Sequence, residues 1–195
     1  MHPSAAGSAH TEVTSSAARA AAEGERPLKA GLASGASEVS LIPVLDDNYV
    51  FVLHGGSGGG GGSDGSDGAP GQAVVVDPAV AEPVIAWLEQ RQLEPIAVLH
   101  THHHHDHIGG TPELLQRWPQ LQVIAAAADR QRIPFQTQGV GDGDRLNLLG
   151  RAIEVLAMPG HTRAHVAFYL PPADEPLDHP SVGELFCGDT LFAGG

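Results

Sequence analysis

The sequence predicts an α/β fold, and three observations lead to this expectation. Short segments rich in Val, Ile and Leu recur along the chain, as is typical of buried strands. Two of them, residues 72–76 and 96–99, flank a segment with helical periodicity at residues 82–93, which makes a strand–helix–strand unit. Several predicted strands end in polar loops that carry His or Asp. We therefore expect functional side chains to gather at strand ends.

Composition limits the classes of partner. The 195 residues suffice for one domain with a hydrophobic core, at 42% hydrophobic and 17% charged residues. A net charge of −13, with Lys29 the only lysine, argues against binding nucleic acid or an anionic membrane surface. The single cysteine, Cys187, excludes an internal disulfide framework and a Cys-rich zinc finger. Without an apolar run near the ~20 residues of a membrane span, or a secretory signal, we expect a cytoplasmic monomer.

The first part of the chain contains two biased segments. Residues 1–37 are rich in Ala, Ser and Gly without a sustained period, so we expect a disordered extension before a domain at residues 38–195. Strands are expected at residues 40–45 and 49–54, joined by a turn. Residues 55–71 are mostly Gly, Ser and Asp and lack the Lys-Ser/Thr of a phosphate-binding loop. We expect this flexible insertion to extend the tip of a hairpin.

The remaining elements are predicted from the spacing of apolar residues and from residues that begin or end helices and strands. Pro83 near the first position and apolar residues three to four apart predict a helix at residues 82–93. After the strand at residues 96–99, Thr111 is expected to cap a second helix, with Pro112 at its first position. Further strands are expected at residues 121–125, 152–157, 164–170 and 184–187, a turn at 139–144, and loops at 158–163 and 171–180, with residues 129–135 ambiguous.

The segment T-H-H-H-H-D-H-I-G-G, residues 101–110, organises the chain. In an extended loop, side chains two residues apart point the same way, so His102 and His104 can reach one metal ion. Asp106 and His107 are adjacent and should diverge, so they suit a second ion nearby. Imidazole and carboxylate ligands without a thiolate fit zinc, with iron or manganese as alternatives.

Four consecutive histidines can also arise without any catalytic role. They could be the remnant of an affinity tag, or a solvated loop that scavenges metal. A tag would sit at a terminus and would not run from a strand into D-H-I-G-G. The H-x-H-x-D-H spacing, which has partners elsewhere in the chain, favours an ordered catalytic metal site.

Two later strand ends also carry metal-type ligands, His161 in M-P-G-H-T and Asp189 in C-G-D-T. Each is a weak signal alone, because such residues are common in solvated loops and turns. Together with the histidine segment they resemble glyoxalase II, the hydroxyacylglutathione hydrolase family of the metallo-β-lactamase fold superfamily. The resemblance covers about residues 39–195. It includes L-D-D-N-Y at 45–49, V-D-P at 76–78, P-G-H-T-R-A-H from Pro159, and L-F-C-G-D-T-L-F-A-G-G at the end.

The resemblance implies a four-layer αββα sandwich of two mixed sheets flanked by helices, incomplete at the C-terminus. It implies two divalent ions, zinc above all. Asp106 would also orient the attacking hydroxide. The implied ligands are His102, His104 and His161 for the first ion, Asp106 and His107 for the second, and Asp189 as the bridge.

The implied activity is hydrolysis of a small-molecule glutathione thioester, S-D-lactoylglutathione, to D-lactate and glutathione in methylglyoxal detoxification. The family's last histidine ligand and its C-terminal helical substrate domain lie downstream of the bridging aspartate. This chain contains neither, so we expect a fragment with little activity. Glutathione is anionic, and the chain offers few cationic partners for it.

Supporting residues are expected around these ligands. Asp77 either accepts a hydrogen bond from a ligand histidine or only ends a strand, and His165 should support the loop of His161. His103 and His105 alternate with the ligands and should face away from the metal.

Other residues of the motifs have weaker assignments. Asn48 and Tyr49 either line the entrance of the site or only shape a turn. Cys187 is expected to be a small core residue.

The alternatives differ in chemistry. One is another enzyme of the same superfamily, either a mononuclear iron persulfide dioxygenase or a different hydrolase. Another is a non-enzymatic, His-rich metal binder. One ion per chain would favour the iron enzyme. Metal retained after alanine replaces Asp189 would favour the binder.

Overall fold

The computed structural model describes residues 37–55, 71–172 and 182–191. The predicted N-terminal extension, apart from Ser37, lies outside these residues. So do the Gly-rich insertion between its two end glycines and most of the predicted loop at residues 171–180. No helix in the described part of the chain is long and apolar enough to cross a membrane.

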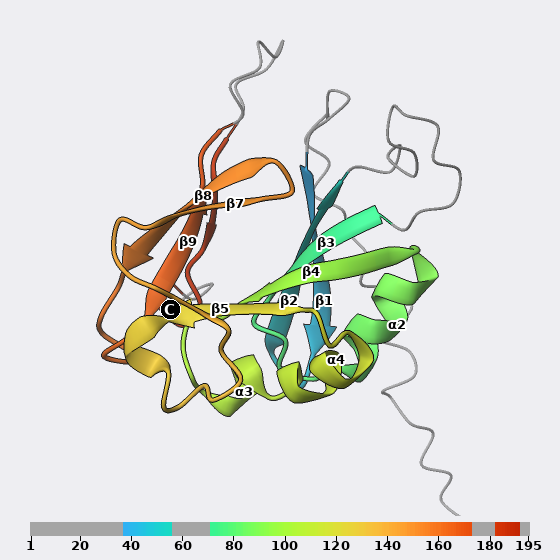
Figure 1. Cartoon of the computed structure of the whole chain (residues 1–195), viewed down its shortest axis with the longest axis horizontal. Helices are drawn as coiled ribbons and strands as arrows, with labels where there is room; N and C mark the ends of the chain where they lie inside the picture. The colour runs from blue at the N-terminus through green and yellow to red at the C-terminus, as the bar shows by residue number, and fades with distance from the viewer. Residues whose placement is uncertain (1–36, 56–70, 173–181, 192–195) are drawn as a thin grey trace, which may run out of the picture.

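A six-stranded mixed sheet forms the larger half of the fold (Figure 1). Its strands pair in chain order. The first two pairs, β1 with β2 and β2 with β3, are antiparallel, as the predicted hairpin requires, and the three later pairs are parallel. The strands are β1 (Ser37–Val44), β2 (Asn48–Gly55), β3 (Gly71–Val76), β4 (Leu93–Leu99), β5 (Gln122–Ala126) and β6 (Gln138–Val140).

The second sheet has four strands in the order β10-β9-β8-β7. The strands are β7 (Arg145–Leu148), β8 (Arg151–Ala157), β9 (Val166–Leu170) and β10 (Glu184–Phe186). Among the described strands all pairs of this sheet are antiparallel, whereas a mixed sheet was expected. The chain runs directly from one strand to the next without an intervening helix among the described residues, which favours antiparallel pairing.

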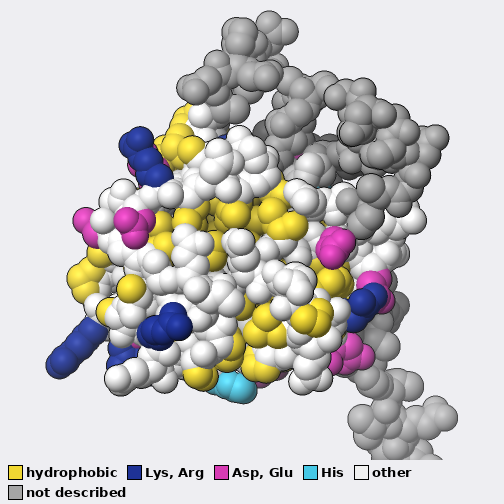
Figure 2. All heavy atoms as spheres, in the orientation of Figure 1, with side chains coloured by type: hydrophobic (Ala, Val, Ile, Leu, Met, Phe, Trp, Pro, Cys, Tyr) yellow, Lys and Arg dark blue, Asp and Glu magenta, His cyan; other side chains and the backbone are white. Residues whose placement is uncertain are grey.

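The two sheets face each other across one hydrophobic core. Leu53, Val76 and Leu99 from the first sheet pack in the same buried cluster as Val155 and Phe168 from the second. Figure 2 shows apolar side chains gathered between the sheets on one face of the molecule, with charged side chains scattered around them. The α/β sandwich predicted from the sequence is therefore present.

Helices cover the outer face of the six-stranded sheet (Figure 1). They are α2 (Glu82–Gln90) and α4 (Thr111–Arg117), which bury Leu88 and Leu114 against Val75 and Val98. The one-turn helix α3 (His105–Ile108) and the 3-10 helix η1 (Ala127–Asp129) complete the helical elements of the described residues.

Several predicted boundaries are wrong for identifiable reasons. Helix α2 ends at Gln90 rather than residue 93, because Gln92 adopts a left-handed backbone with φ of 54°. Strand β4 begins three residues earlier than predicted. Its pairing with β3 skips Ile96 next to Pro95, whose ring nitrogen cannot donate a ladder hydrogen bond.

Other differences involve contacts that local sequence does not reveal. Thr111 is the first residue of α4 rather than its cap, and its hydroxyl binds His100 Nε2 at 2.9 Å. Gly139 belongs to β6 and not to the predicted turn, and β7 was not predicted. Both β6 and β7 are short, and short strands carry little periodic signal.

Candidate metal centre

The candidate site lies where loops from both sheets meet. The histidine segment follows β4, His161 lies in the loop between β8 and β9, and Asp189 follows β10. Backbone hydrogen bonds hold the start of the histidine segment in place: His100 N, just before it, donates to Ile124 O, and Val166 N donates to Thr101 O, each at 2.9 Å. The second bond joins the two sheets directly at the site.

Three histidine side chains converge at one point. His104 Nδ1 lies 3.2 Å from His102 Nε2 and 2.9 Å from His161 Nε2, and the three ligand atoms all lie within 4.8 Å of one another. Nitrogens bound to one tetrahedral zinc at ~2.05 Å would be about 3.3 Å apart. The chain thus brings together the three histidines that the sequence nominated for the first ion.

Asp189 lies between this set and His107. Its Oδ2 is 3.4 Å from His161 Nε2, and its Oδ1 is 3.0 Å from His107 Nε2. Asp106 Oδ2 approaches the same His107 nitrogen at 3.6 Å. Among the described residues, Asp106, His107 and Asp189 do not form a set as compact as the three histidines.

His107 Nε2 is buried and makes no hydrogen bond within the described part of the chain, despite its two carboxylate neighbours. Burying a polar nitrogen without a partner is costly. A nitrogen held this way, with carboxylate oxygens aimed at the same region, is the arrangement that a cation would complete.

Asp77 anchors the histidine segment from the end of β3. Its Oδ1 accepts a hydrogen bond from Thr101 N at 2.8 Å, and its Oδ2 accepts bonds from the Thr101 hydroxyl at 2.6 Å and His107 Nδ1 at 3.1 Å. Asp77 also forms a compact set with His102 and His107. Because these bonds already occupy its carboxylate, we interpret Asp77 as orienting His107 rather than as a ligand.

The pKa values reflect this network. Burial raises the pKa of Asp77, but hydrogen bonds with His100 and His107 outweigh it and hold the pKa well below its usual range. Burial lowers the pKa of His107, yet the hydrogen bond and charge of Asp77 raise it overall. Burial, helped by the charge of His107, lowers the pKa of His102 to about 3, so this imidazole stays neutral and able to bind a metal.

The other nominated histidines have structural contacts. His165 is 1% exposed and stacks on His102, with ring centroids 4.9 Å apart and an 18° angle between the rings. Its carbonyl accepts a hydrogen bond from Met158 N, which closes the loop that carries His161. His103 turns away and places Nδ1 3.0 Å from Asp129 Oδ2.

Some contacts at the site were not predicted. Asp129 is fully buried and also binds Arg132, with Oδ1 2.7 Å from Nε, although its segment had no clear periodicity. Asn48 donates hydrogen bonds to Asp106, so it does more than shape a turn. Cys187 is partly exposed, contrary to the expected core position.

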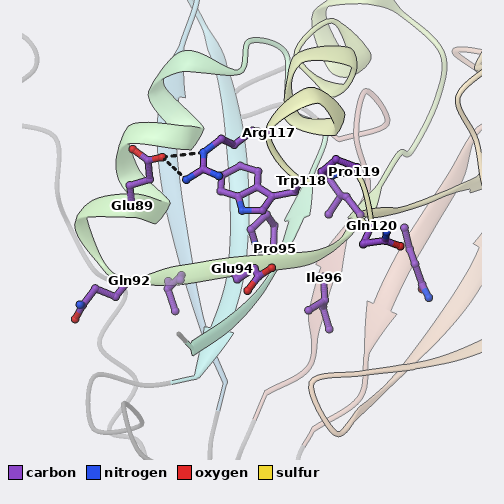
Figure 3. A pocket seen from close by; sticks show the side chains of 12 residues that line it. Glu89, Gln92, Glu94, Pro95, Ile96, Arg117, Trp118, Pro119 and Gln120 are labelled. Atoms are coloured by element: carbon purple, nitrogen blue, oxygen red, sulfur yellow. Dashed lines mark hydrogen bonds and ion pairs between the residues drawn. The ribbon is translucent and has the colours of Figure 1, made fainter. Parts of the chain in front are cut away.

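A separate cavity of about 750 Å³ lies at the other end of β4 (Figure 3). It is lined by the ends of α2 and α4 and by the start of β4, and its lining includes the ion pair of Glu89 and Arg117, 3.1 Å apart. Because the histidine segment follows the opposite end of β4, and none of the nominated ligands lines this cavity, it is distinct from the candidate metal centre.

The chain is similar to a known protein family and to named relatives within it. The family model described as "Metallo-beta-lactamase superfamily" matches residues 68–195. The chain is 53% identical over 159 residues to a hydroxyacylglutathione hydrolase of Parasynechococcus marenigrum (strain WH8102), covering 82% of this chain and 57% of that protein. It is 52% identical over 159 residues to a protein of the same name from Prochlorococcus marinus (strain MIT 9303), covering 82% and 55%. The chain thus spans somewhat more than half the length of these relatives.

Solved structures agree at the level of the fold. The subclass B3 metallo-beta-lactamase BJP-1 of Bradyrhizobium japonicum superposes with a TM-score of 0.57 at 16% identity, covering 78% of this chain and 60% of that one. The B3 metallo-beta-lactamase BLEG-1 gives 0.55 at 23% identity, covering 68% and 66%. With the family model matched over most of its length and the sandwich in place, the chain belongs to the metallo-β-lactamase superfamily.

Proposed function

We propose that this chain carries the metal-binding part of a hydroxyacylglutathione hydrolase, an enzyme that hydrolyses S-D-lactoylglutathione to D-lactate and glutathione. The observation that carries the proposal is the convergence of His102, His104, His161 and Asp189 from loops of both sheets. Relatives about half identical to the chain bear this enzyme's name.

The residues present fit two divalent ions. His102, His104 and His161 would hold the first, Asp106 and His107 the second, and Asp189, with one oxygen toward each set, would lie between them. The donors are imidazoles and carboxylates, which suit zinc, with iron or manganese as alternatives. The buried, unbonded Nε2 of His107 supports the second position.

Such ions would supply Lewis acidity that activates water and polarises the thioester carbonyl. The chain's own residues prepare the site. Asp77 fixes the ring of His107, and the 49% exposed side chain of Asp106 can accept a hydrogen bond from the attacking water. The leaving thiolate, whose conjugate acid has a pKa near ~8.5, needs little proton donation, so a nucleophilic Ser or Cys is unnecessary.

The side chains of Asp106, His161 and Asp189, which are 49%, 33% and 23% exposed, would be accessible to a substrate. We further propose that the chain acts as a cytoplasmic monomer. The single cysteine suits a reducing compartment.

The test combines metal content with turnover. The metal-free 195-residue chain, reloaded with zinc, should bind two ions and hydrolyse S-D-lactoylglutathione at a low rate that disappears on chelation. Asp189→Ala should reduce the content to one ion and abolish turnover. The matched control is Glu113→Ala, which removes an exposed carboxylate from α4 and should change neither quantity.

Two results would contradict the proposal. One ion per chain with oxygen consumption on a persulfide substrate would identify an iron dioxygenase instead. Full metal content in Asp189→Ala, together with a rate of thioester hydrolysis that zinc does not change, would identify a histidine loop that only scavenges metal.

A further inference from the structure

We infer that Asn48, at the start of β2, is a positioning residue that fixes the carboxylate of Asp106 for the second ion. The inference rests on the proposed metal centre, in which Asp106 is a ligand. It begins from two hydrogen bonds of one amide group. Asn48 Nδ2 donates to Asp106 O at 3.1 Å and to Asp106 Oδ2 at 3.2 Å, across 58 residues of sequence.

Asp106 needs an external support because its own helix gives little. Helix α3 has four residues, and the side chain of Asp106 is half exposed. In a longer helix the carbonyl of Asp106 would accept from the N–H of Gly110, four residues on. Here Gly110 N donates to Pro78 O at 2.9 Å, and Gly109 N donates to His105 O at 2.7 Å. Asn48 supplies the donor that the Asp106 carbonyl lacks.

The second bond connects this support to the chemistry. The oxygen that accepts from Asn48, Oδ2, is also the Asp106 oxygen that lies 3.6 Å from His107 Nε2. A carboxylate oxygen has two lone pairs, so one can accept the amide hydrogen while the other faces a cation. By holding the backbone and the carboxylate of Asp106 together, Asn48 restricts the side chain to one orientation.

The hairpin that presents Asn48 has a strained turn. Val44 pairs with Asn48, so only three residues make the turn, and one of them, Leu45, is 57% exposed and has a φ of 53°. A left-handed backbone is unfavourable at a leucine, so the surrounding contacts must hold the turn in place.

A double-mutant cycle tests the inference. Zinc competition titrations would compare the unchanged 195-residue chain with Asn48→Ala, Asp106→Ala and the double variant. Asn48→Ala should weaken the second ion ~10-fold and leave the first unchanged, within the range seen when groups that orient ligands are removed. In the Asp106→Ala background it should have no further effect. Asn48→Asp should weaken the second ion more, ~100-fold, because its carboxylate repels Asp106.

Controls separate positioning from a purely structural cap. Asp47→Ala, in the same exposed turn, should bind both ions as the unchanged chain does. If Asn48→Ala does not fold, Asn48→Ser, which keeps a shorter donor, replaces it and should give a smaller loss. An equal loss from the Asn48 change with and without Asp106 would show that Asn48 only caps α3. No loss would also overturn the inference. If Asp106→Ala itself leaves the second ion unchanged, the proposed ligand role fails, and the inference fails with it.

Discussion

Asp77 has a left-handed backbone, with φ of 50°, at the end of a buried strand. Asp and Asn tolerate this conformation better than other residues with a Cβ. The turn places the carboxylate under Thr101 and His107, where it accepts three hydrogen bonds. One residue outside the histidine segment therefore determines how the segment's backbone and one of its rings are oriented.

His102 gives a pH prediction for the metal-free chain. Its pKa in the folded state is about 3, against an ordinary value of 6.5. Above pH 6.5 both states are neutral at this ring. Between pH 6.5 and 3 only the unfolded chain takes up the proton. The free energy of unfolding should therefore decrease as the pH is lowered, by at most ~1.4 kcal/mol per pH unit. Urea unfolding at pH 7, 6, 5 and 4 measures this loss.

Two neighbouring histidines affect the free energy of unfolding in the same pH range, and they do so differently. The pKa of His165 is lowered by burial, so it adds to the loss on acidification. The pKa of His107 is raised, so its stabilising contribution is fully present below pH 6.5 and does not oppose the trend. His102→Gln should give a shallower dependence between pH 6.5 and 4. If the free energy of unfolding of this variant fell as steeply with decreasing pH, His102 would not be the cause of the loss.

At the scale of elements, the loop after β10 depends on one glycine. Gly188 has a φ of 48°, and a Cβ there would collide with the Thr101 side chain and lie 3.0 Å from His165 Nε2. The absence of a side chain lets this loop approach the histidine segment closely enough to deliver Asp189. The same residue therefore serves both the backbone conformation and the closeness of the two loops.

Gly188→Ala should separate Asp189 from the histidines. The left-handed backbone alone costs an alanine ~1–2 kcal/mol, and the collision adds to it. We expect reduced stability and loss of one zinc ion per chain, measured by thermal unfolding and metal analysis. Gly143→Ala is the matched control, since Gly143 has a φ of 78° but open space where a Cβ would be. It should lose stability while keeping both ions. Full zinc content in Gly188→Ala would count against the close approach.

At the scale of the whole molecule, the proposed ligands are divided between the sheets. His102, His104, Asp106 and His107 follow a strand of one sheet, whereas His161 and Asp189 follow strands of the other. Metal bound by both groups would link the sheets and would stabilise the folded state by mass action, ~2.7 kcal/mol at a free concentration of 100 Kd.

A core variant tests this link. Phe168 is fully buried between the sheets, and Phe168→Ala should lower the free energy of unfolding by ~3–5 kcal/mol. Saturating zinc should raise the unfolding temperature of this variant and of the unchanged chain alike. The same addition to Asp189→Ala should give a smaller rise. The ion held by His102, His104 and His161 would still link the sheets in Asp189→Ala, so an equal rise in this variant would mean that Asp189 adds nothing to the stabilisation by zinc.

The sequence predicted which loops at strand ends carry the candidate ligands better than it predicted the contacts that these loops make with one another. Buried apolar runs indicated β3, β4, β8 and β9. The spacing of His102 and His104 indicated two side chains to test, and the family resemblance added His161. Local sequence could not reveal that Asp106 and His107 lie in a helical turn, that Asp129 accepts from His103, or that Asn48 reaches Asp106. These contacts depend on how segments far apart in the chain pack together, which a short stretch of sequence does not determine.

Both tryptophans lie on the side of the six-stranded sheet away from the second sheet. Trp87 in α2 and Trp118 at the end of α4 pack against the cluster beneath the helices, each with an arginine over its ring, Arg91 and Arg117 (Figure 3 shows Trp118). Intrinsic fluorescence should therefore follow loosening of the helical layer and stay nearly constant while zinc enters the loops. An emission change at low zinc would signal a rearrangement that reaches across the whole sheet.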